Sequence, residues 1–393
     1  MSTENGTGRL MSGRSLPVSS NIPQMNALRV LAMFGIFFHH LGMTVIRDPQ
    51  TALHRIFHSV AYSGADGVIF FNIISGFLLA YPYLGPVRRP FPRYGTFVRS
   101  RFVRIVPAYY IALLVITAAN ILLLDHKAGL SLQYMLEHAI FVNSFHYETL
   151  NLNTAAFWYL AMLAHFYLLF PFILRLFLRI GPTRAALSLI TLSWVVCGLV
   201  CLYLYVNPNS VFRMAGQLMY FNLPVRLPEF VIGIWFASVW DPSASKIRES
   251  GMNRPFTFLV TGMALYALLC ILFPERVTSI FYYILHVSAA VPLFVLLFLW
   301  RPMSRAAGSA MVGKLSRYSF CIYMVHQPIF NYVGVTPGTV PGTILEFFKL
   351  FVLLFPLSYL AAAVLDRAAG MVLNLFQRKP GAGASISGRE RLF

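Results

Sequence analysis

Ten apolar segments, each about 20 residues long, recur along this chain of 393 residues. A segment of that length is sufficient to cross the hydrocarbon core of a bilayer as an α-helix. Hydrophobic residues make up 58% of the chain and charged residues only 11%, a balance that excludes a water-soluble enzyme. The sequence therefore predicts an all-α polytopic membrane protein with about ten transmembrane helices. The segments are 25–46, 61–83, 105–124, 155–174, 186–206, 222–240, 256–273, 279–300, 318–335 and 342–365.

The positive charges predict how these helices are oriented. The chain has 31 Lys and Arg against 13 Asp and Glu, a formal net charge of +18. Of the 31, 23 fall in the two termini and the even-numbered loops, and five fall in the odd-numbered loops. By the positive-inside rule, both termini and the even-numbered loops face the cytoplasm. The basic charge is thereby explained by topology, and no nucleic acid is expected as a partner.

The sequence predicts a single membrane domain between two tails. Residues 1–24 are polar and are expected to form a disordered cytoplasmic tail, residues 25–366 the ten-helix domain, and residues 367–393 a second cytoplasmic tail. The stretch 131–142 is too short to span a bilayer, so we expect it at the membrane interface.

Ionisable residues at membrane depth are costly and therefore indicate function. Arg29 and His40 lie eleven residues apart in the first segment. At about 100° per residue, both project from one helix face, whereas His39 points elsewhere. We therefore expect Arg29 and His40 to belong to a functional site.

Two other groups of polar residues admit two interpretations each, and a third group lies on a later predicted helix. Arg101 and Arg104 share a face if their segment is helical, and they would serve either topology and anionic lipid or a phosphate-bearing cytosolic ligand. Arg226 and Glu229 are spaced to pair, as a structural ion pair or as part of a polar substrate pocket. His326 follows Tyr323 on one predicted helix and adds further polar groups at membrane depth.

Taken together, these residues resemble the acyltransferase-3 family of integral membrane acyltransferases. The resemblance covers about residues 26–366 and consists of six short motifs in the family's order. They lie at 26–32 followed by His40, at 67–78, 101–109, 158–171, 226–233 and 319–328. There are departures from the family pattern: Asn72 replaces a Phe, Ser100 replaces the first of two Arg, and Leu163 stands where many members carry Glu.

The resemblance implies transfer of an acyl group, expected to be acetyl, from cytosolic acyl-CoA to a hydroxyl of a sugar or similar acceptor. His40 would be the base and Arg29 would hold the site or the donor. Arg101, Arg104 and Ser75 would bind acyl-CoA; Ser75 could instead carry a covalent acyl group or, beside Gly76, serve close helix packing. The residues expected to bind the acceptor or support the fold are Trp158, Tyr167, Arg226, Glu229, Tyr323 and His326.

The expected partners are acyl-CoA as co-substrate, a carbohydrate or glycolipid acceptor, and membrane lipids. No bound cofactor or metal is expected, because His and acidic residues do not cluster at ligand spacing. The expected location is a bacterial-type cytoplasmic (inner) membrane, with polysaccharide modification as the role. The alternative is a polytopic transporter or flippase that uses the intramembrane Arg, His and Glu residues.

Overall fold

The described part of the chain is a bundle of α-helices. The computed structural model describes residues 22–46, 51–86, 88–124, 132–145, 155–207, 221, 223–241, 246–247, 279–336, 338–339 and 342–377. Its helices are α1 (Pro23–Val45), α2 (Ala52–Ser63), α3 (Gly67–Leu84), α4 (Tyr94–Leu124), α5 (Leu132–Ala139), α7 (Trp158–Ile180), α8 (Pro182–Val206), α10 (Leu223–Val239), α12 (Ser279–Leu299), α13 (Arg301–Ala306), α14 (Ala310–Tyr332) and α15 (Ile344–Gln377).

Short elements complete the described structure. Three 3-10 turns connect helices: η1 (Gly64–Asp66), η3 (Asn143–Phe145) and η4 (Ala155–Phe157). Two strands of two residues, β1 (Trp240–Asp241) and β2 (Lys246–Ile247), pair antiparallel after α10.

The membrane class predicted from the sequence is confirmed. Within the described ranges, six helical stretches are long and apolar enough to cross a bilayer. The total number of spans and the orientation of the termini stay predictions, and the predicted segment 256–273 lies outside the described residues. The six stretches are Pro23–Val45, Ala52–Leu84, Tyr94–Leu123, Trp158–Ile180, Pro182–Val200 and Ile344–Leu375.

Helix limits differ from the predicted segments in two places that affect the site. Helix α4 begins at Tyr94, so the second half of the predicted arginine-rich loop, with Arg99, Arg101 and Arg104, forms its first turns. The predicted segment began at residue 105 because it was defined by apolar residues alone. Arginine is nevertheless a good helix former, so the helix starts earlier. Helix α15 continues to Gln377, past the limit predicted at residue 365.

The predicted interfacial stretch contains the short helix α5, which docks on α4. Tyr109 donates a hydrogen bond to the carbonyl of His138 (3.0 Å), and Tyr110 donates one to the carbonyl of Ala139 (2.5 Å). The ring of Tyr134 covers the imidazole of His138 at 4.2 Å between centroids. Burial lowers the pKa of His138 to about 4, so this contact is made by a neutral ring at physiological pH.

The outer surface of the bundle carries large apolar side chains along three helices. A soluble protein rarely exposes such continuous apolar area, whereas a helix in a bilayer presents it to lipid. These side chains are Leu114, Val115, Leu122 and Leu123 on α4, Leu192, Val195, Leu199 and Leu202 on α8, and Leu345, Phe348, Val352, Leu353, Leu360 and Val364 on α15.

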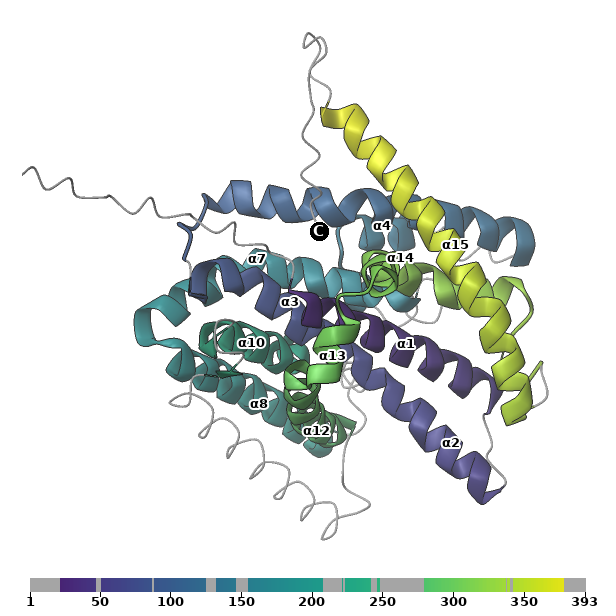
Figure 1. Cartoon of the computed structure of the whole chain (residues 1–393), viewed down its shortest axis with the longest axis horizontal. Helices are drawn as coiled ribbons and strands as arrows, with labels where there is room; N and C mark the ends of the chain where they lie inside the picture. The colour runs from purple at the N-terminus through teal and green to yellow at the C-terminus, as the bar shows by residue number, and fades with distance from the viewer. Residues whose placement is uncertain are drawn as a thin grey trace, which may run out of the picture.

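Helix α1 is the hub of the arrangement. It packs against α2, α3, α14 and α15, while α10 lies between α3 and α8. In Figure 1, α15 runs obliquely across α14 and α4, and α8 and α10 lie together on the opposite side of the bundle. The residues expected in the site therefore lie on α1, α3, α4, α7, α10 and α14.

Helices α3 and α10 cross with their backbones in direct contact. A Cβ atom on Gly76 would collide with the carbonyl of Phe230, and one on Gly233 would collide with the carbonyl of Ile73. Each helix thus places a glycine against the backbone of the other, the small-residue packing that membrane helices favour. Gly76 thus makes a close helix contact, whereas the role of the neighbouring Ser75 stays a prediction.

Replacing Gly76 by valine is expected to destabilise the protein by about 3 kcal/mol or more, because the opposing atoms are backbone and cannot rotate away. Thermal unfolding in detergent, followed by size exclusion, measures the loss. The matched control is Gly198→Val on α8, where an added Cβ meets nothing within 4 Å. Equal loss in both variants would mean that helix propensity, and not the crossing, is responsible.

Candidate active site

A cavity of about 280 Å³ opens beside the second half of α1. Pockets for small ligands begin at about this size. Its wall combines imidazole, phenol, indole and amide groups with apolar side chains. The lining residues are Ile36, His39, His40, Ala65, Val68, Ala156, Trp158, Phe221, Tyr323 and Gln327.

His40 is held at this cavity by α14. Its Nδ1 lies 2.7 Å from Nε2 of His326, and the two rings stack with centroids 5.0 Å apart. Its neighbour His39 turns toward α2 instead, where Nδ1 lies 3.2 Å from the carbonyl oxygen of Ala61. His39 and His40 therefore point in different directions, as helix geometry predicted, although both rings line the cavity.

Arg29 lies on the same side of α1, as predicted. Its Nη1 donates to the hydroxyl of Ser316 on α14 (3.3 Å), and this hydroxyl donates to Asn26 (3.1 Å). Eleven residues of helix separate Arg29 from His40 by about 16 Å along the axis. The two side chains therefore share a face but do not meet, so one group of reacting atoms cannot contact both.

Arg29 belongs instead to a group of cations and phenols near the starts of α1 and α4. It interacts electrostatically with Arg104 and Tyr167, and Tyr167 also interacts with Arg101. Arg104 is exposed, while the buried Nε of Arg101 has no hydrogen-bond partner. Arg101 and Arg104 both lie in helix α4, three residues apart. The helical segment that their shared face requires is therefore confirmed.

Tyr159, which sequence reasoning missed, lies between these cations and the cavity. Its hydroxyl shares a hydrogen bond with Ser75 and interacts electrostatically with Arg29. Its ring contacts Tyr323 on the cavity wall, with centroids 5.4 Å apart. The signal was present, since Tyr159 lies inside the motif from which Trp158 and Tyr167 were chosen.

Arg226 and Glu229 form the expected pair, with Nη1 and Oε1 2.9 Å apart and side chains only 1% and 0% exposed. Asn72 on α3 donates a second hydrogen bond to Glu229. The guanidinium of Arg226 also lies over the ring of Trp158, 5.3 Å from its centroid. Because Trp158 lines the cavity and the ion pair lies behind it, the geometry favours the structural interpretation of the pair.

The role of Asn72 was not apparent from the sequence. It was visible only as a departure from the family pattern, an amide where a phenyl ring is usual. In the structure this amide is fully buried and supplies the carboxylate of Glu229 with a donor. A buried carboxylate requires such partners.

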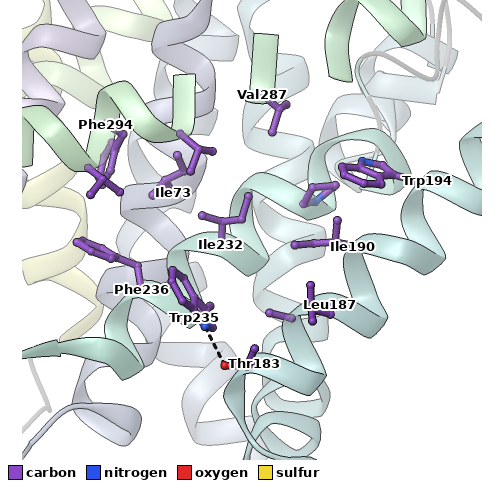
Figure 2. Close-up of a pocket in the computed structure, with 14 residues that line it drawn as sticks. Ile73, Thr183, Leu187, Ile190, Trp194, Ile232, Trp235, Phe236, Val287 and Phe294 are labelled. Carbon is purple, nitrogen blue, oxygen red and sulfur yellow. Dashed lines mark hydrogen bonds between the residues drawn. The ribbon is translucent and has the colours of Figure 1, made fainter. Parts of the chain in front are cut away.

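A second, apolar crevice of about 40 Å³ lies between α3, α8, α10 and α12. Figure 2 shows apolar side chains facing one another across it, including Trp194, Ile232 and Phe294. The hydrogen bond from the indole of Trp235 to the hydroxyl of Thr183 (3.3 Å) marks one end. With no titratable group among its lining residues, this crevice does not supply acid–base chemistry.

Comparisons with known proteins agree with the motifs. A family described as an acyltransferase domain matches residues 22–363. O-acetyltransferase OatA of Staphylococcus aureus strain NCTC 8325 / PS 47 is 22% identical over 337 residues, covering 80% of this chain and 51% of the relative. OatA of strain MRSA252 matches with the same identity and coverage.

The chain thus spans about half the length of the curated relatives it matches. No solved structure matches it at a significant level. The family match extends from the first turn of α1 into α15 and includes every helix that contributes to the cavity. The chain therefore belongs to the acyltransferase-3 family.

Proposed function

We propose that this protein is a membrane O-acetyltransferase that moves an acetyl group from cytosolic acyl-CoA to a hydroxyl of a carbohydrate-like acceptor. The observation that carries the proposal is the placement of His40 on the wall of the 280 Å³ cavity. Arg29, one member of the cationic group, lies on the same face of α1 about 16 Å away. The activity in the printed name of OatA supports the acetyl group and the oxygen acceptor.

The cationic group suits the phosphates of CoA. Guanidinium groups match phosphate oxygens in charge and geometry. In the predicted orientation, Arg29, Arg101 and Arg104 lie toward the cytoplasm, where acyl-CoA is found. The buried, unpartnered Nε of Arg101 is a donor that a phosphate oxygen would satisfy.

The distance between the cations and the cavity suits the length of the donor. About 16 Å of helix separate Arg29 from His40, and the extended pantetheine arm of CoA is of comparable length. Ser75 and Tyr159, which share a hydrogen bond, and then Tyr323 provide polar groups along this distance. The thioester would thus reach His40 while the phosphates stay at the cytoplasmic end.

At the cavity, His40 would act as the general base. A neutral imidazole accepts the proton of the acceptor hydroxyl as that oxygen attacks the thioester carbon. When the carbon–sulfur bond breaks, the same imidazolium returns the proton to the departing sulfur. The products are an acetyl ester and CoA with a free thiol, and His40 is regenerated.

The acceptor would approach from the side of the cavity opposite the cations. Trp158 presents its indole there, and aromatic faces with a few polar groups are typical of such binding sites. The ion pair of Arg226 with Glu229 would fix Trp158 from behind.

The replacement of both Arg101 and Arg104 by alanine is expected to weaken acetyl-CoA binding about 100-fold or more, since each charge-assisted contact contributes about 1.5–3 kcal/mol. Isothermal calorimetry on detergent-purified protein measures this. The matched control is Arg175→Ala/Arg179→Ala, which removes two exposed cations near the C-terminal end of α7. Equal binding by all three proteins, or none by wild type to any acyl-CoA, would contradict the donor and favour a transporter.

A further inference from the structure

The bond between His40 and His326 defines which nitrogen of each ring carries a proton. Nδ1 of His326 lies 3.1 Å from the carbonyl oxygen of Ile322, one turn earlier on α14. A carbonyl oxygen only accepts hydrogen bonds, so Nδ1 of His326 is the protonated nitrogen. In a neutral imidazole the other nitrogen, Nε2, is then an acceptor.

The ring of His326 is placed to remain neutral and fixed. It is 1% exposed and is surrounded by the rings of Phe37 at 5.9 Å and Phe330 at 5.7 Å. An unpaired imidazolium in such surroundings is expensive, so burial favours the neutral form. The contacts of Nδ1 with the carbonyl of Ile322 and of Nε2 with His40 favour this orientation of the ring.

The proton of His40 follows from that of His326. Nε2 of His326 accepts, so Nδ1 of His40, 2.7 Å away, must donate. The lone pair of His40 is then on Nε2. The ring of His40 lines the cavity. The nitrogen that can accept a proton there is Nε2, which does not bond to His326.

We propose that His326 is a positioning residue that selects the tautomer of His40 in which Nε2 is the base. This rests on the proposed function, and it revises the expectation that His326 binds acceptor or supports the fold. In the reaction, Nε2 of His40 takes the hydroxyl proton, and the Nδ1–H bond to His326 stabilises the resulting imidazolium. The proton then passes from Nε2 to the departing thiolate, and His326 neither gains nor loses one.

Two substitutions at His326 separate positioning from packing. His326→Gln places an amide oxygen, an acceptor, near the original Nε2, whereas His326→Phe fills the space without an acceptor. With water as acceptor, release of CoA thiol from acetyl-CoA gives kcat and KM. We expect His326→Phe to lower kcat on the order of 100-fold with KM for acetyl-CoA unchanged, and His326→Gln to retain kcat within about tenfold.

The matched control is His165→Phe on α7, the same change at a membrane histidine that does not line the cavity, and kcat should not change. Equal loss of kcat in both His326 variants, with thermal stability intact, would overturn the proposal. So would a KM increase without a kcat decrease.

The tautomer itself is measurable without turnover. Nitrogen NMR on protein with labelled histidine, assigned by the His40 and His326 variants, distinguishes protonated from unprotonated ring nitrogens. We expect an unprotonated Nε2 on His40 in wild type and a mixture of tautomers in His326→Phe. A protonated Nε2 in wild type would overturn the inference. If wild type shows the expected tautomer but releases no thiol, the proposed function fails while the histidine pairing stands.

Discussion

Replacing His40 by alanine is expected to lower kcat by about 10²–10⁴-fold, the usual contribution of a general base. The loss should appear in kcat rather than in KM for acetyl-CoA, because the proposed phosphate contacts lie about 16 Å away at the other end of α1. Folding should persist, since His40 is only half-buried. Release of CoA thiol from acetyl-CoA by purified protein measures the effect.

His39→Ala provides the matched comparison. It removes the adjacent imidazole from the same cavity wall, yet His39 is bonded to the backbone of α2 rather than to His326. We expect a loss below about tenfold, from altered cavity shape rather than from a missing base. A larger loss in His39→Ala than in His40→Ala would reassign the base to the neighbouring residue.

The second large effect is expected at the buried ion pair. Arg226→Met would leave the carboxylate of Glu229 without its cation in a site that is 0% exposed, and breaking a buried pair from one side costs about 3–5 kcal/mol. The double variant Arg226→Met/Glu229→Gln removes both charges and keeps an acceptor for Asn72. We expect it to recover most of that loss. Thermal unfolding in detergent measures both variants.

The same pair of variants decides between the two interpretations of Arg226 and Glu229. If the pair supports Trp158 from behind, a stable double variant should retain most of its kcat for thiol release. A double variant that is stable but inactive would place the charges in the substrate pocket instead.

Helix periodicity was sufficient to predict contacts within one element. It placed Arg29 and His40 on one face of α1 and paired Arg226 with Glu229 three residues later, and both predictions are confirmed. These follow from 3.6 residues per turn and need no tertiary information. The same rule could not identify the residues that Arg29 and His40 contact on α14, which are Ser316 and His326.

Contacts between distant segments were not predictable from this one sequence. The bonds of His40 to His326 and of Asn72 to Glu229 join residues 286 and 157 positions apart. They depend on how α1 meets α14 and how α3 crosses α10, which side-chain volume and close glycine packing determine. Tyr159 was missed for a related reason, since only its position between Ser75 and Tyr323 distinguishes it from other aromatic residues.

The most direct test of transfer from a cytosolic donor uses membrane vesicles of both orientations. Radiolabelled acetyl-CoA, which does not cross the bilayer, is added outside inverted vesicles and outside right-side-out vesicles containing the wild-type protein or His40→Ala. We expect thiol release and label transfer to carbohydrate only with wild type in inverted vesicles, where Arg101 and Arg104 face the added acetyl-CoA. Equal turnover by His40→Ala, or turnover only in right-side-out vesicles, would contradict a cytoplasmic arginine site that delivers the acetyl group to His40.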